Sequence, residues 1–143
     1  MMEDLDQLKL KNQLCFPLYA CAKEVVRRYR PFLDELDLTY TQYIVMLVLW
    51  EENEKSVHDL GERLFLDSGT LTPVLKSLEA KGYLTRRRSK ADERVLLVAL
   101  TDEGKALKES AAGIPQKMSA CVALEPQEAA TLYSLLYKML GQF

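Results

Sequence analysis

The most reactive side chains in this sequence are three cysteine thiols, Cys15, Cys21 and Cys121. A thiolate is a nucleophile, a metal ligand and a target of oxidation, whereas a thiol can also be a small buried hydrophobe. The odd number and wide spacing of the cysteines match no zinc pattern, and the single His58 cannot complete one. We therefore expect no metal and no cofactor, and redox chemistry is the main alternative to simple packing.

Cys15 lies in the segment NQLCFPLYACAKE. If Asn12 caps a helix, Cys15 falls at about its third position, where free backbone N–H groups and the helix dipole favour an anion. The regular helix can instead begin at Pro17, a favourable first residue. We hypothesise that the apolar neighbours of this thiol suit an alkyl or lipid hydroperoxide better than hydrogen peroxide; they are Leu14, Phe16 and Leu18.

A reactive thiolate needs donors that orient and stabilise it, and tyrosine hydroxyls can do this. Three tyrosines fall in segments that we expect near the N-terminal helix, namely Tyr19, Tyr29 and Tyr40. Taken alone, each is better interpreted as a half-buried ring whose hydroxyl is hydrated.

A second candidate site is the basic segment RRRSKADER, residues 86–94, which has five basic and two acidic residues in a chain of net charge −2. The acidic total argues weakly against nucleic acid, but the local charge favours it. Arg94 is suited to a narrow minor groove, and Asp92 could pair with its guanidinium and aim it. Four further basic residues would hold backbone phosphates: Arg86, Arg87, Arg88 and Lys90.

The elements that must position these residues are mostly helices. Pro31 should kink or end the first, Thr39 or Thr41 should open the second, and Met46 should lie in the core. Asp67 or Ser68 can cap the fourth helix. The expected helices are residues 13–36, 37–52, 56–66, 67–82, 101–118 and 124–141, and the expected strands are residues 83–88 and 95–100.

Residues 56–100 therefore read as a winged helix-turn-helix in a mainly α fold with a small β-wing. The second helix of such a motif enters the major groove of DNA, although a solvated helix face is an equal alternative until the basic wing is considered. Its expected outward residues are Ser68, Thr70, Thr72, Lys76 and Ser77. Residues 1–143 would form a single domain, in which residues 1–38 and 101–143 supply helices for dimerisation.

The stretch LGERLFLDSGTLTPVLKSLEAKGYLTRRRSKADERVLLVALTDEGKAL resembles the MarR family of winged-helix repressors, including Asp-Glu-Arg at the wing. Three segments, LKNQLCFPLYA, LDLTYTQYIVMLVLWE and LFLDSGTLTP, are similar to its organic-hydroperoxide-sensing branch, OhrR. The resemblance implies a homodimeric repressor that binds double-stranded operator DNA when reduced and dissociates when Cys15 is oxidised. It also implies that Tyr29 and Tyr40 of one subunit face Cys15 of the other.

The fate of oxidised Cys15 depends on the other two thiols, because a sulfenic acid condenses with a nearby thiol. Cys21 would lie about 9 Å away along a continuous helix, beyond the roughly 7 Å limit for a disulfide, so we interpret it as structural. Cys121 resembles the resolving cysteine of two-cysteine OhrR proteins, which pairs with the sensing cysteine of the other subunit. An inert surface or core thiol is the alternative.

Three other functions compete with this interpretation. A MarR-type repressor could respond to a small aromatic ligand, and a winged helix can serve protein contacts alone. A thiol peroxidase or reductase is disfavoured, because the sequence has no Cys-x-x-Cys and no Gly-rich nucleotide loop, so we expect no enzyme.

The longest apolar run, residues 43–50, is too short to cross a bilayer, and the acidic N-terminus lacks an apolar signal core. We therefore expect a cytoplasmic protein without a membrane partner.

Overall fold

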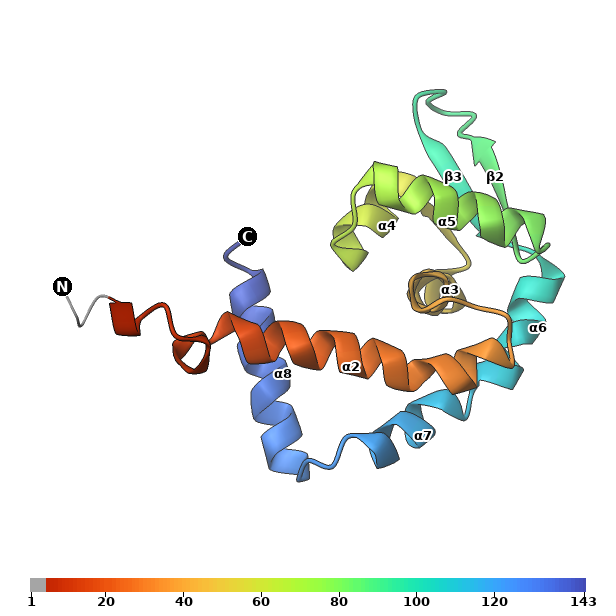
Figure 1. Cartoon of the computed structure of the whole chain (residues 1–143). Coiled ribbons are helices and arrows are strands. Elements are labelled where there is room, and N and C mark those ends of the chain that lie inside the picture. Colours follow the sequence, from red (N-terminus) through yellow and green to blue (C-terminus); the bar gives the residue numbers. More distant parts are fainter. Residues whose placement is uncertain (1–4) are drawn as a thin grey trace. The chain divides into compact units, whose positions relative to one another are not determined.

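The structure is a computed structural model that describes residues 5–143. Residues 1–4 lie outside the described residues. They belong to the N-terminal segment in which the sequence predicts no export signal. The chain forms two compact units that divide between Ala112 and Gly113. The first contains a 3₁₀ helix at Leu10–Asn12, α2 (Cys15–Asp34), α3 (Tyr40–Glu52), β1 (Glu54–Ser56), α4 (Val57–Leu64), α5 (Ser68–Ala80), β2 (Leu84–Arg88), β3 (Leu96–Leu100) and α6 (Asp102–Ala111). The second contains α7 (Ile114–Cys121) and α8 (Pro126–Leu140) (Figure 1).

Helix α3 is the centre of the first unit and is apolar on almost every face. Val45, Met46 and Leu49 on this helix are fully buried, which confirms Met46 as a core residue. Each buried side chain of this size contributes about 1.5–3 kcal/mol to the free energy of folding. The helices and strands packed around α3 complete the core with Leu60, Leu71, Leu75, Leu78, Leu84 and Val98.

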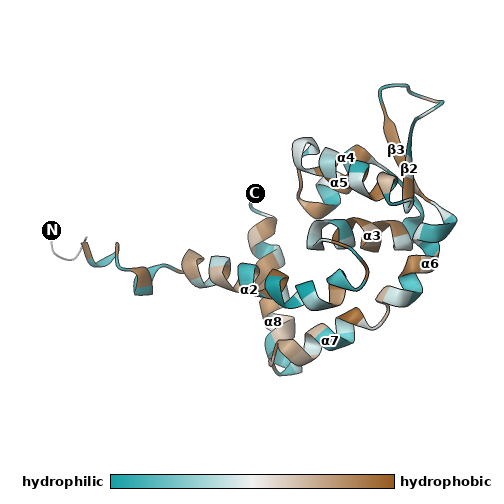
Figure 2. Ribbon diagram, turned by 45° about the vertical axis from the view of Figure 1, so that its right-hand side comes forward, coloured by the Kyte–Doolittle hydropathy of each residue, from teal (hydrophilic) through white to brown (hydrophobic). Residues whose placement is uncertain are grey.

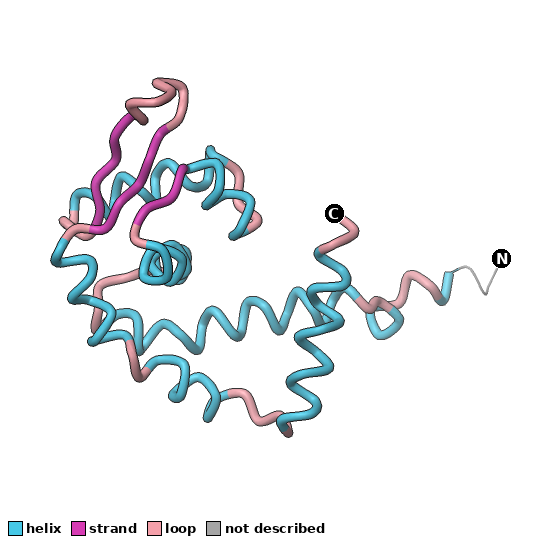
Figure 3. Tube along the Cα trace, turned by 180° about the vertical axis from the view of Figure 1, so that it is seen from behind, coloured by secondary structure: helices cyan, strands magenta, loops and turns pink. Residues whose placement is uncertain are grey.

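The wing is part of a three-stranded antiparallel sheet with strand order β1-β3-β2 (Figure 3). The β2–β3 hairpin was predicted, and its register pairs Leu84 with Leu100 and Arg88 with Leu96. Strand β1 was not predicted, because its three residues are polar and too few to show alternation. It pairs with β3, so β3 is the central strand and is hydrogen-bonded to β1 on one side and β2 on the other at the base of the wing.

Most helix starts agree with the sequence. Thr39 caps α3 through a reciprocal capping box with Gln42, Asp67 caps α5, and Thr101 caps α6. Each cap side chain accepts a backbone N–H that would otherwise lack a partner in the first turn. Gly82 follows α5 with a φ of +85°, a conformation that favours glycine at the end of a helix.

The expected cap of α2 was wrong. Asn12 belongs to the short 3₁₀ helix and its side chain donates to the carbonyl of Asp6, so α2 begins at Cys15 with Leu14 as the residue before it. Pro31 does not end the helix, which continues to Asp34. The hydrogen bond that Pro31 cannot donate is missing on a solvent-exposed face, where water can replace it.

The single helix expected over residues 101–118 is two helices. Helix α6 ends at Ala111, and α7 begins at Ile114 and continues to Cys121. The break follows from local chemistry, because Pro115 has no N–H to donate to the carbonyl of Ala111 and Gly113 favours helix least among ordinary residues. Among the residues that the structure describes, no helix is long and apolar enough to cross a membrane.

Candidate thiol site and nucleic-acid interface

Cys15 is the first residue of α2, not the third as the sequence suggested, and it is exposed. It still lies in the first turn, where backbone N–H groups lack helical partners, although Pro17 removes one of these donors. Leu14 is 80% exposed and Phe16 is 43% exposed. The thiol therefore lies on an open apolar surface, which an alkyl group could contact.

The other two thiols are also exposed and unpaired. Cys21 is in the same unbroken helix as Cys15, so the separation of about 9 Å along the axis holds and a direct disulfide would require α2 to unwind. Cys121 is the last residue of α7, whereas the helices expected over residues 101–118 and 124–141 would leave it in the connection between them. It directly precedes the four-residue connection to α8, at a position where the chain is not constrained by helix on both sides.

Tyr29 from α2 and Tyr40 from α3 form an aromatic cluster, with ring centroids 4.9 Å apart. Tyr43, one turn after Tyr40 on α3, completes it at 5.6 Å from Tyr29 and 6.3 Å from Tyr40. The sequence analysis missed Tyr43, although its i,i+3 spacing from Tyr40 places both on one helix face.

The hydroxyl groups of this cluster stay protonated at neutral pH. Burial, followed by the nearby Tyr40 and Tyr43, raises the pKa of Tyr29 to about 12. Burial also raises the pKa of Tyr40, and burial together with Tyr40 raises that of Tyr43. Each phenol is therefore a hydrogen-bond donor, which is the form that an anionic sulfur or oxygen requires.

Tyr19 does not belong to the cluster. It is 60% exposed, and the ammonium of Lys23 lies 5.1 Å from its ring centroid. Cys15 is also remote from Tyr29, because fourteen residues of continuous helix separate them by about 21 Å along the axis. The predicted thiol and tyrosines therefore do not meet through α2 within one chain.

The second helix of the turn, α5, presents Ser68, Thr70 and Lys76 as exposed side chains. Its N-terminus is capped, because the carboxylate of Asp67 accepts the backbone N–H of Thr70 at 2.7 Å, a bond that lowers the pKa of Asp67. The hydroxyl of Thr72 is partly exposed and donates to the carbonyl of Ser68. These residues remain candidates for contact with DNA.

Ser77 does not face outward as predicted. Its hydroxyl accepts a hydrogen bond from the side-chain amide of Gln42 at 2.9 Å, so it faces α3 inside the unit. The sequence analysis placed it outside because serine is common on surfaces, and no local pattern marks its partner, 35 residues earlier in the chain.

At the wing tip the predicted pair of Asp92 and Arg94 is present. The Asp92 carboxylate accepts from the Arg94 guanidinium at 3.1 and 3.2 Å and from its backbone N–H at 3.1 Å, and these bonds lower the pKa of Asp92. The side chain of Arg94 is nevertheless 90% exposed. The guanidinium of Arg94 is thus oriented by Asp92 but remains open to a ligand. The β2–β3 hairpin that carries it extends beyond the helices of its unit (Figure 1).

The remaining basic residues of the wing divide into two kinds. Arg88 and Lys90 are exposed, and their side chains have no hydrogen-bond or ion-pair partner among the residues that the structure describes. Arg87 is exposed and pairs with Glu54 at 2.9 Å. Arg86, in contrast, is partly buried and bound to Glu79 through its guanidinium and its backbone N–H, which lowers the pKa of Glu79. The Nε and Nη2 donors of Arg86 thus attach β2 to α5, so this conformation does not favour the phosphate role predicted for it, which stays a prediction.

Both ends of the chain carry apolar side chains that remain uncovered in the single chain. Figure 2 shows hydrophobic residues along α2 and α8. On α2 and the segment before it they include Leu8, Leu10, Leu14, Phe16, Leu18, Val25 and Val26. On α8 they include Leu132, Tyr133, Leu135 and Tyr137. Apolar surface of this extent is typical of an interaction site.

The chain is similar to a known family of transcriptional regulators and to a characterised relative. Residues 27–111 match a family described as transcriptional regulator SarA/Rot. The organic hydroperoxide resistance transcriptional regulator of Bacillus subtilis is 46% identical over 140 residues, which cover 98% of this chain and 95% of that protein.

Solved structures of AbfR, a protein of Staphylococcus epidermidis, are also similar. The structure of reduced AbfR bound to DNA has 34% identity and a TM-score of 0.80, with 99% of each chain covered. The structure of disulfide-formed AbfR has 36% identity and a TM-score of 0.66, with 96% of this chain and 97% of that chain covered. These similarities confirm the winged helix-turn-helix fold.

Proposed function

Because the chain belongs to the MarR family of winged-helix transcriptional regulators, we propose that it is a redox-sensing repressor. In its reduced state it binds operator DNA, and oxidation of Cys15 by an organic hydroperoxide releases it and derepresses a peroxide-detoxification gene. Such a protein acts in the cytoplasm, where its operator is found. The role needs no enzymatic turnover, because one oxidation event per thiol is enough.

Binding of DNA is supported by the chemistry of α5 and the wing. Ser68, Thr70 and Lys76 are exposed on the helix that would enter the major groove. Arg94 is held by Asp92 at the tip of the hairpin, where a guanidinium can enter the minor groove. Arg88 and Lys90 supply charge for phosphates without first breaking an ion pair.

We propose that two copies of the chain form the functional unit. The uncovered apolar residues of α2 and α8 would be buried in a homodimer formed by residues 1–38 and 101–143, while residues 56–100 remain free for DNA. A twofold dimer presents two recognition helices to half-sites about one helical turn apart. In such a unit Cys21, which is exposed in the single chain, could be covered and structural.

The observation that carries the sensing role is the separation of Cys15 from the tyrosine cluster along one helix. In a dimer with antiparallel α2 helices, Cys15 of one chain would meet Tyr29 and Tyr40 of the other. Their protonated hydroxyls can donate to a thiolate, and the exposed apolar surface at Leu14 and Phe16 suits the alkyl part of a hydroperoxide.

The chemistry then has two steps. The Cys15 thiolate attacks the terminal oxygen of the hydroperoxide, the O–O bond breaks and Cys15 becomes a sulfenic acid, while the alkoxide takes a proton from solvent and leaves as an alcohol. The thiolate of Cys121 from the second chain then attacks this sulfur, the S–O bond breaks and a disulfide forms, while the released hydroxide takes a proton from solvent and leaves as water. Cys15 supplies the two electrons that reduce the hydroperoxide in the first step, and the second step shares this oxidation between the two sulfurs without a further oxidant.

Oxidation would release DNA by changing the dimer. A sulfur with bound oxygen, or one in a disulfide, is no longer the anion that the tyrosine hydroxyls stabilise. A bond from Cys15 to Cys121 would also pull the end of α7 towards α2 of the partner. The spacing of the two α5 helices would then no longer match the half-sites, and affinity would fall.

The test compares wild-type protein with Cys15→Ser on the operator, before and after treatment with a bulky organic hydroperoxide or hydrogen peroxide. We expect wild type to dissociate faster with the organic oxidant and Cys15→Ser to stay bound with both. Cys21→Ser is the matched control and should behave as wild type. Normal release by Cys15→Ser would refute the sensing role, and equal rates with both oxidants would refute the preference for organic hydroperoxides.

A further inference from the structure

Gln42 is the one buried polar side chain of the first unit among the described residues, with 5% exposure. It is the third residue of α3 and lies between Tyr40 and Tyr43, two members of the tyrosine cluster. Neither the thiol chemistry nor the contact with DNA accounts for an amide at this position. A buried amide without hydrogen bonds is costly, so its partners indicate what it does.

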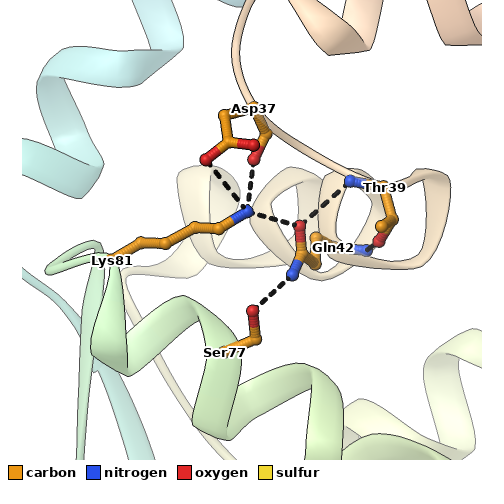
Figure 4. Close-up of polar contacts among 5 residues, drawn as sticks. All are labelled: Asp37, Thr39, Gln42, Ser77 and Lys81. Carbon is orange, nitrogen blue, oxygen red and sulfur yellow. Dashed lines mark hydrogen bonds and ion pairs between the residues drawn. The ribbon is translucent and has the colours of Figure 1, made fainter.

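The side chain of Gln42 connects α3 to the recognition helix α5 (Figure 4). Its Nε2 donates to Oγ of Ser77 at 2.9 Å, and its Oε1 accepts from Nζ of Lys81 at 3.2 Å. The same Oε1 accepts the backbone N–H of Thr39 at 3.0 Å, which closes the capping box of α3. One amide therefore joins the first turn of α3 to the C-terminal end of α5.

A second connection runs beside the first. Nζ of Lys81 donates to the backbone carbonyl of Asp37 and lies 3.6 Å from its carboxylate. Asp37 belongs to the turn between α2 and α3 and has a φ of +54°, a left-handed conformation that is unusual for a residue with a side chain. The turn that joins the two tyrosine-bearing helices is thus tied directly to the end of the recognition helix.

This arrangement couples the positions of its members, because Gln42 is buried and its amide cannot shift alone without losing hydrogen bonds to Thr39, Ser77 or Lys81. Tyr40 and Gln42 share the first turn of α3, so they move together. A shift of Tyr40 would carry Gln42 with it, and Ser77 and Lys81 would either follow or lose their hydrogen bonds.

We propose that Gln42 is a positioning residue that couples the state of the thiol site to the orientation of the recognition helix. The inference rests on the proposed function, in which the partner's Cys15 contacts Tyr29 and Tyr40. When that contact is lost, Tyr40 moves, and the contacts of Gln42 with Ser77 and Lys81 turn α5 away from its position on DNA.

The test measures operator affinity of the reduced and the oxidised protein and takes their ratio as the coupling factor. Gln42→Leu keeps the volume of the side chain and removes all three of its hydrogen bonds. We expect the coupling factor to fall by about two- to thirtyfold, the range found for residues that transmit coupling between sites. A purely structural residue would lower thermal stability and leave the ratio unchanged.

Trp50→Phe is the matched control. Trp50 lies on the same helix, and its indole N–H donates to the carbonyl of Gly104 at 2.9 Å, so the variant removes one hydrogen bond between α3 and α6 rather than α5. We expect a lower melting temperature and an unchanged coupling factor. Ser77→Ala removes a single hydroxyl from the network and replaces Gln42→Leu if the latter does not fold. It should lower the coupling factor in the same direction.

The outcomes separate the inference from the function on which it rests. If wild type keeps its operator affinity after oxidation, the proposed function fails and the coupling role fails with it. If wild type responds and Gln42→Leu or Ser77→Ala gives the same ratio, only the coupling role is refuted. An equal loss of coupling in Trp50→Phe would also refute it, because any perturbation of α3 would then have the same effect.

Discussion

Cys15 and Tyr29 lie on the same unbroken helix, separated by about 21 Å along its axis. The thiol cannot reach the tyrosine along α2 of its own chain. If the two groups act together, as we propose, then the reactive site exists only where two chains meet. This makes the site testable by mixing chains.

Mixed dimers should distinguish a shared site from a site within one chain. The mixed dimer combines a Cys15→Ser chain with a Tyr29→Phe/Tyr40→Phe chain. Its one remaining Cys15 is in the tyrosine-variant chain, and it faces the intact tyrosines of the other chain only if the site is shared. We expect its oxidation rate to equal that of wild type, whereas the homodimer of the tyrosine variant reacts about tenfold more slowly through loss of hydrogen bonds to a charged group. Equally slow reaction of the mixed dimer would contradict a shared site.

Cys121→Ser should abolish the covalent dimer that hydroperoxide produces on a non-reducing gel. In the mechanism that we propose, Cys121 supplies the second sulfur, whereas Cys21 is held in the helix that carries Cys15. Cys21→Ser should therefore still give the covalent dimer. Mass spectrometry of the oxidised wild type should map the bridge between Cys15 and Cys121. A bridge from Cys15 to Cys21 would instead refute the role of Cys121, and within one chain it would require α2 to unwind.

Arg94→Ala should weaken operator binding by about tenfold and reduce the slope of log Kd against log salt concentration by about one. Arg86→Ala is a matched control, because it removes the same charge from the same hairpin. Since Arg86 is bound to Glu79, its loss should lower the melting temperature and change operator affinity much less. Comparable losses of affinity in both variants would show that the wing acts through total charge only.

The tyrosine cluster predicts a distinct alkaline titration. Its Tyr29 has a pKa of about 12 in the folded chain, against 10.0 when exposed, so folding favours the protonated phenol. The contribution of Tyr29 to the free energy of unfolding is complete below pH 10 and is lost as the pH rises to about 12. Absorbance of phenolate near 295 nm should show this late step, and Tyr29→Phe should remove it while steps nearer pH 10 remain.

Much of the fold was predictable from local chemistry. The caps at Thr39, Asp67 and Thr101 and the hairpin of residues 84–100 follow from signals within a few residues of each other. Local signals failed where two of them competed. Asn12 is a good cap residue, but it lies in a 3₁₀ helix instead. The apolar spacing of residues 101–118 suggested one helix, but Gly113 and Pro115 interrupt it.

The sequence by itself determined the chemical inventory: an N-terminal thiol, its apolar neighbours, the tyrosines and a basic hairpin. Only the tertiary structure decided which groups are available and which are engaged. It placed Ser77 against Gln42 and Arg86 against Glu79, and it left Arg94 exposed. The physical reason is that hydrogen bonds and ion pairs between distant segments depend on how helices and strands pack, and helical or strand periodicity carries no information about that partner choice.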